Sequence, residues 1–168
     1  MIQTKTEQEK IELEHTDPVI ATNGGLIAEF ERGLAPEGFH HADHVRVAFA
    51  YVSELPLLEA LARFSAALKR FALAQGKPNL YHETITWIYL FLIAERSDLP
   101  GRTQTWEEFA ECNADLLKWK DGILEKYYEP TTLWSDRARH RFVLPDRGPS
   151  DHANSEQKPS REGAPEKA

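Results

Sequence analysis

Two short motifs contain four of the chain's seven histidines. The first, FHHADH over residues 39–44, holds three of them, and the second, YHET over residues 81–84, places a histidine beside an acid. Residues three or four apart share one face of an α-helix, so His44 would lie on the same face as His40 or His41. Two imidazoles on one helix face can bind a divalent metal ion through neutral nitrogens. The motifs therefore predict a functional pocket.

Two kinds of chemistry fit such a pocket. The leading hypothesis is a divalent transition metal bound by His40, His41, His44 and His82, in an enzyme that acts on a small molecule. The alternative enzyme needs no metal, and its catalytic residues are His44, His82 and Glu83. Histidine with a carboxylate partner is the usual general base near neutral pH.

Other interpretations of the same residues stay open. Asp43 is a candidate ligand, or it orients a histidine ring through the second ring nitrogen. Thr86 lies one helical turn after His82 and either bonds the pocket or back-bonds to the helix carbonyl. In a third hypothesis the histidines are structural, and the chain is a non-catalytic interaction or regulatory module with no identified protein partner.

The elements that must position these motifs are predicted to be helices. Apolar residues recur at helical spacing over 41–55 and 57–76, and a third helix is expected over 79–96. Because a whole helix separates the two motif-bearing helices, both motifs would lie at the same end of an up-down-up bundle. Shorter helices are expected over 26–32, 105–111, 113–119, 122–128 and from 135. The predicted fold is therefore all-α, a compact bundle of three long and several short helices.

Three local signals refine this prediction. The sequence Asn-Gly-Gly over 23–25 predicts a turn before the first helix, and Pro56 fits the first position of the second long helix. Pro130 is expected to end a helix, because proline cannot continue the hydrogen-bond ladder. The pair Thr105 and Glu108 has the spacing of a capping box.

The composition divides the chain into three parts. All seventeen aromatic residues lie between Phe30 and Phe142. Residues 1–18 are polar and are expected to be flexible, and residues 148–168 lack Val, Ile, Leu, Met and aromatic residues, which predicts a disordered tail. The expected folding unit is a single helical domain over 19–147. Of the net charge of −7, the two terminal segments carry −3 and −1, which leaves −3 for that domain.

Charge and cysteine content exclude several classes of function. The excess of acidic residues disfavours binding to nucleic acid or to a membrane surface. Cys112 is the only cysteine, so neither an intrachain disulfide nor a thiolate zinc finger can form. No secretory signal and no apolar run of membrane-spanning length is visible, so the cytoplasm is the expected compartment. A small-molecule ligand is the partner that the pocket predicts.

A basic strip near the C-terminal end of the domain is a weaker candidate site. It could bind a carboxylate or phosphate group. Nearby acids reduce its positive charge, and a solvated surface is the simpler interpretation. Its members are Arg137, Arg139, Arg141 and Arg147.

Three motifs together resemble a known group of sequences. They are FHHADH at 39–44, YHETITW at 81–87 and FVLPD at 142–146. This combination resembles a family of small, functionally uncharacterised bacterial proteins with paired FHHxDH and YHET motifs. The resemblance covers about residues 25–147, and it implies no activity, cofactor or partner.

Overall fold

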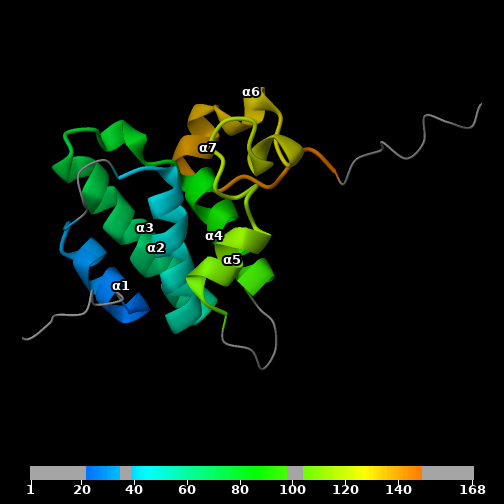
Figure 1. Cartoon of the computed structure of the whole chain (residues 1–168). Coiled ribbons are helices and arrows are strands. Elements are labelled where there is room, and N and C mark those ends of the chain that lie inside the picture. Colours follow the sequence, from blue (N-terminus) through cyan, green and yellow to red (C-terminus); the bar gives the residue numbers. More distant parts are fainter. Residues whose placement is uncertain (1–21, 35–38, 98–103, 149–168) are drawn as a thin grey trace, which may run out of the picture.

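A computed structural model of the chain describes residues 22–34, 39–97 and 104–148 (Figure 1). No described residue lies in a β-strand, so the predicted all-α fold is confirmed. The predicted flexible segment 1–18 and nearly all of the predicted tail 148–168 lie outside the described residues. In the described part the helices are α1 (Asn23–Glu31), α2 (His41–Glu54), α3 (Leu57–Ala74), α4 (Glu83–Ser97), α5 (Trp106–Cys112), α6 (Pro130–Leu133) and α7 (Asp136–His140), with 3-10 turns at Pro78–Leu80 and Ile123–Lys126.

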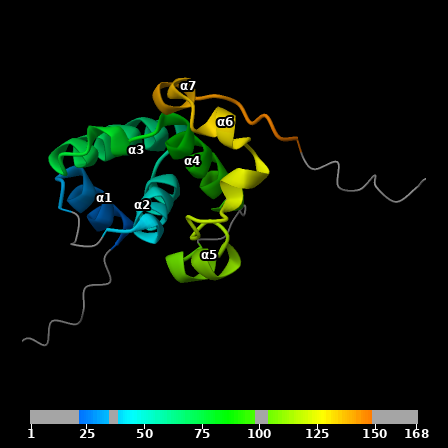
Figure 2. The ribbon, with the colours of Figure 1, turned by 90° about the horizontal axis from the view of Figure 1, so that it is seen from above.

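The three long helices form the centre of the molecule. Helix α2 contacts α1, α3 and α4, and helix α4 contacts α7. In Figure 1 and Figure 2, α1 lies against α2 on one side, and α5, α6 and α7 lie on the side of α4. Among the described helices, none is both long enough and apolar enough to cross a membrane.

Helices α2 and α4 contribute several of the most deeply buried side chains of the core. Helix α2 buries Phe49 and Tyr51 completely or nearly so, and α4 buries Leu90 and Ile93. Helix α4 has buried residues on most of its circumference, as its nearly continuous apolar sequence predicts. Four phenylalanine rings pack against one another between α1, α2 and α3, with centroid separations of 5.4 to 5.9 Å, and they are Phe30, Phe39, Phe64 and Phe71.

Several predicted helix ends are confirmed. Helix α3 ends just before Gly76, whose φ of +66° suits a residue without a Cβ. Helix α5 begins with the predicted capping box, in which the Thr105 hydroxyl accepts from the Glu108 amide and the Glu108 carboxylate accepts from the Thr105 amide. The local side chains alone specify both ends.

Two predictions made from local punctuation are wrong. The Asn-Gly-Gly segment forms the first turn of α1 instead of a separate turn, because the Thr22 hydroxyl accepts from the Gly25 amide and caps the helix. Pro130 begins α6 instead of ending a helix, since the first helical position needs no amide donor.

Three other predictions on the long and short helices are also corrected. Pro56 precedes α3 as its N-cap residue and does not occupy the first helical position. Residues 78–80 form a 3-10 turn, so α4 begins at Glu83 and not near Asn79. Residues 113–119 form turns and a bend and not a helix, and the Asn113 side chain bonds back to the Phe109 carbonyl oxygen where α5 ends.

Candidate functional site

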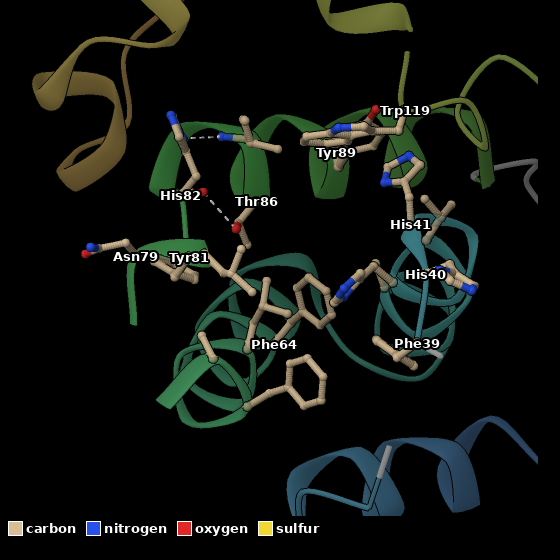
Figure 3. A pocket seen from close by; sticks show the side chains of 18 of the residues that line it. Phe39, His40, His41, Phe64, Asn79, Tyr81, His82, Thr86, Tyr89 and Trp119 are labelled. Carbon is tan, nitrogen blue, oxygen red and sulfur yellow. Dashed lines mark hydrogen bonds between the residues drawn. The ribbon is translucent and has the colours of Figure 1, made fainter. Parts of the chain in front are cut away.

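A pocket of about 540 Å³ opens between the start of α2, the end of α3 and the start of α4 (Figure 3). All four histidines of the two motifs line it, namely His40, His41, His44 and His82. Aromatic and aliphatic side chains from the long helices, among them Phe64, Leu68 and Ile85, form most of the remaining wall. The structure therefore brings the two motifs to one pocket, because α3 returns the chain to the end of the bundle from which α2 started.

His82 is fully bonded to the protein. Its Nε2 lies 2.9 Å from the Leu133 carbonyl oxygen, and its Nδ1 accepts from the Ile85 amide at 3.3 Å. The carbonyl fixes the proton on Nε2, so the ring is neutral and caps the first turn of α4. Burial lowers the pKa of His82 and keeps the ring in this state. Neither nitrogen is free for a metal or for proton transfer.

His41 bonds the protein through one nitrogen. Its Nε2 lies 2.9 Å from the Leu116 carbonyl oxygen, so Nε2 carries the proton in the neutral ring. Burial lowers the pKa of His41. The ring also contacts the Tyr89 ring, with centroids 5.0 Å apart. Its Nδ1 has no hydrogen bond to any described residue and remains an acceptor.

His44 differs from the other buried histidines. Neither of its ring nitrogens is hydrogen-bonded to a described residue, and Nδ1 is buried without a partner. The ring packs edge-on against Phe39, with centroids 4.4 Å apart. Burial lowers the pKa of His44 to about 4, and the nearby His41 contributes to the shift. The ring is therefore neutral at pH 7, with one donor and one acceptor that no described residue uses.

The remaining polar residues of the first motif act at the start of α2. His40 is exposed at the pocket and directly precedes the helix. The Asp43 carboxylate accepts the His40 amide proton at 2.8 Å. Asp43 thus caps the helix and, placed in its first turn, also suits the helix dipole.

Glu83, predicted as a catalytic carboxylate, does not line the pocket. Its carboxylate forms an ion pair with Lys69 at 3.2 Å, and the Lys69 ammonium lies 4.6 Å from the centroid of the Tyr81 ring. The angular step of about 100° between successive helical residues explains the result, because it turns Glu83 away from the face that His82 and Thr86 share. Thr86 makes the simple back-bond, donating to the His82 carbonyl oxygen at 2.9 Å.

The geometry does not support the predicted metal site. In Figure 3, His82, Thr86 and Tyr89 follow one another along α4, and His41 lies at the Tyr89 end. Seven residues of helix span about 10 Å, far beyond the roughly 2 Å of a zinc–nitrogen bond. No group of three or more His, Cys, Asp or Glu side chains in the described ranges is arranged to hold a metal ion. A bound metal stays a prediction.

Two exposed tryptophans form the outer wall of the pocket, and sequence reasoning missed both. The Trp119 ring lies against His41 and the Trp134 ring against His82, with centroids 5.2 and 6.0 Å apart. The two indoles are 6.5 Å from each other, and their residues are 52% and 55% exposed. Trp119 ends the predicted helix over 113–119, which does not form, and Trp134 lies in no predicted helix, so no periodic signal indicates their positions.

The two histidines position these tryptophans. His41 bonds the carbonyl of Leu116, three residues before Trp119, and His82 bonds the carbonyl of Leu133, the residue before Trp134. Each imidazole thus fastens one segment of the outer wall to a long helix. The hypothesis that the histidines are structural fits these two of the four.

The Thr84 side chain of the second motif hydrogen-bonds the backbone at the third motif. Its hydroxyl lies 2.8 Å from the carbonyl oxygens of both Ala138 and Arg141, and it accepts from the Val143 amide at 3.1 Å. The Phe142 ring stacks on Trp87 with centroids 5.3 Å apart. The YHET and FVLPD motifs therefore meet as a structural joint between α4 and the C-terminal segment.

Comparison of the chain with protein-family models, with curated proteins and with solved structures finds no match.

Proposed function

We propose that this protein binds a small organic molecule in the pocket and that His44 is its principal polar contact. The observation that carries the proposal is the half-buried His44 ring, whose buried Nδ1 bonds no described residue. An unsatisfied buried polar atom costs about 1–3 kcal/mol, and a ligand that bonds the ring offsets part of that cost. An apolar pocket with a few polar groups is also the usual form of a small-molecule site.

The ionisation of His44 favours recognition over catalysis. With a pKa of about 4, the ring is a weak proton acceptor at neutral pH, whereas an efficient general base has a pKa near the working pH. The two other residues predicted to be catalytic are engaged elsewhere, His82 with Leu133 and Glu83 with Lys69. A neutral imidazole that offers one donor and one acceptor suits a ligand with a hydroxyl, amide or carbonyl group.

A screen of small aromatic compounds by amide NMR tests the proposal. Bound compounds are expected to shift the resonances of His44, Tyr89 and Trp119, because all three line the pocket. His44→Leu is expected to weaken the binding of these compounds by about tenfold, which corresponds to the loss of one hydrogen bond.

Two variants serve as controls for the screen. His140→Leu makes the same change at an exposed residue of α7 outside the pocket and should leave binding intact. Leu68→Trp fills the pocket from α3 and should abolish binding while the helical circular-dichroism signal is kept. Compounds that shift only residues remote from the pocket, or that bind the His44→Leu protein as tightly, would overturn the proposal.

A further inference from the structure

The charge of the pocket wall is unlike that of the chain. The chain carries 27 acidic residues against 20 Lys and Arg, yet no Asp or Glu is among the described residues that line the pocket. The same described residues include one guanidinium, that of Arg139, and no lysine. The described wall offers a cationic ligand no carboxylate for an ion pair, and the guanidinium favours an anionic ligand.

Arg139 is held in place but is not neutralised. Its Nη1 donates to the Asn79 carbonyl oxygen at 2.7 Å, and its side chain forms no ion pair with a described carboxylate. In contrast, Arg63, Arg96 and Arg147 each form an ion pair with an acid. One contact leaves most of the five guanidinium donors available, and the planar fork matches a carboxylate in a bidentate geometry.

The aromatic wall lies next to this guanidinium. Trp134 and Arg139 line the pocket together, and the positive charge of Arg139 contributes to lowering the pKa of His82, which contacts the Trp134 ring. Trp119 extends the wall toward His41. Exposed indole faces at the edge of a pocket offer stacking surface to a flat ring.

Resting on the proposed function, we infer that the ligand is an aromatic carboxylic acid bound as its anion. Arg139 binds the carboxylate, Trp119 and Trp134 contact the flat body, and a hydroxyl or carbonyl group at the far end bonds the His44 ring. Arg139 acts here as the specificity-determining residue, because it separates an anion from a neutral molecule of the same shape.

Calorimetry with 2-naphthoate and its neutral isostere 2-naphthamide tests the inference. In the unmodified protein the anion is expected to bind at least about tenfold more tightly, as one charge-assisted pair allows. Raising the salt concentration from about 0.05 M to about 0.5 M should weaken the binding of 2-naphthoate and leave the binding of 2-naphthamide unchanged, since salt screens only the charged pair.

Arg139→Gln is expected to bring the two affinities to within about twofold of each other, because it removes the charged partner. The ratio of the affinities is the decisive measurement, since loss of the Asn79 contact by itself would weaken both probes alike. Arg137→Gln, an exposed change on the same helix outside the pocket, should keep the tenfold preference.

The outcomes separate this inference from the proposed function. Equal binding of the two probes to the unmodified protein, or a preference that survives Arg139→Gln, overturns the anionic ligand and leaves the small-molecule pocket standing. Failure of both probes to bind at millimolar concentration, together with an empty NMR screen, overturns both proposals.

Discussion

At the scale of single residues, the ionisation of His44 links the pocket to stability. Burial lowers its pKa from 6.5 to about 4 in the folded protein, whereas the unfolded chain regains the ordinary value. Between these two values the unfolded state binds a proton that the folded state does not. Stability therefore falls as the pH drops from about 6.5 to about 4, by roughly 3 kcal/mol in all, and this contribution is constant below that range.

His44→Phe should remove this pH dependence, because the variant keeps a flat ring against Phe39 but cannot be protonated. At pH 7 its free energy of unfolding is expected to equal or exceed that of the unmodified protein, since the unsatisfied nitrogen is gone. Its advantage should grow by about 2 kcal/mol when the pH is lowered to 5. Urea unfolding at the two pH values measures the change.

The matched control for this measurement is His140→Phe on the exposed surface of α7. The difference in free energy of unfolding between this variant and the unmodified protein should not grow by about 2 kcal/mol from pH 7 to pH 5. If the His44→Phe advantage is the same at both pH values, the His44 ring does not titrate as its burial predicts.

The sequence predicts the place of the histidines better than their roles. The spacing of His41 and His44 puts both rings in the first turns of one helix, and that local geometry is enough to bring them to the pocket. The engagement of His82 could not be predicted, because its partner is the Leu133 carbonyl oxygen, 51 residues further along the chain. A backbone carbonyl is common to all residues and leaves no mark in the sequence.

At the scale of elements, the joint between α4 and the C-terminal segment depends on Thr84. Thr84→Val keeps the shape of the side chain but removes a buried hydroxyl, which leaves the Val143 amide and a carbonyl unsatisfied. The free energy of unfolding is expected to fall by about 1–3 kcal/mol. Denaturant unfolding measures the loss.

Thr86→Val is the matched control, two residues later on the same helix. Its hydroxyl makes the back-bond to the His82 carbonyl oxygen within its own helix, so the expected loss is below about 1 kcal/mol. Equal losses from the two variants would contradict the assignment of Thr84 as the joint.

Elements that depend on neighbouring residues could be predicted from the sequence, and those that depend on distant contacts could not. Helices α2, α3 and α4 could be predicted because the apolar spacing of each lies within its own residues, although the predicted start of α4 is near Asn79 and the observed start is at Glu83. The region over 113–119 could not, although Leu116 and Leu117 fit a helical pattern. There the chain turns so that the Leu116 carbonyl can meet His41, a contact across 75 residues.

At the scale of the whole molecule, the pocket joins parts of unequal stability. Its inner wall is formed by α2, α3 and α4, which supply most of the buried hydrophobic residues of the core. Its outer wall includes Trp119, which lies in the segment 114–122. Within this segment, the amide of Leu116 alone donates a backbone hydrogen bond to a described residue. Local opening of such a segment costs less than global unfolding.

Hydrogen exchange is therefore expected to be slowest in α2 and α4 and fast over 114–122. His41→Leu should quicken exchange further over 114–122, because it frees the Leu116 carbonyl that ties this segment to α2, and should leave α4 unchanged. His140→Leu is the matched control and should alter neither region. Uniform protection over all described helices and the 114–122 segment would contradict this division. If the segment 114–122 exchanges faster than the long helices, the outer wall can open while those helices stay folded. Such opening gives a ligand a route to His44.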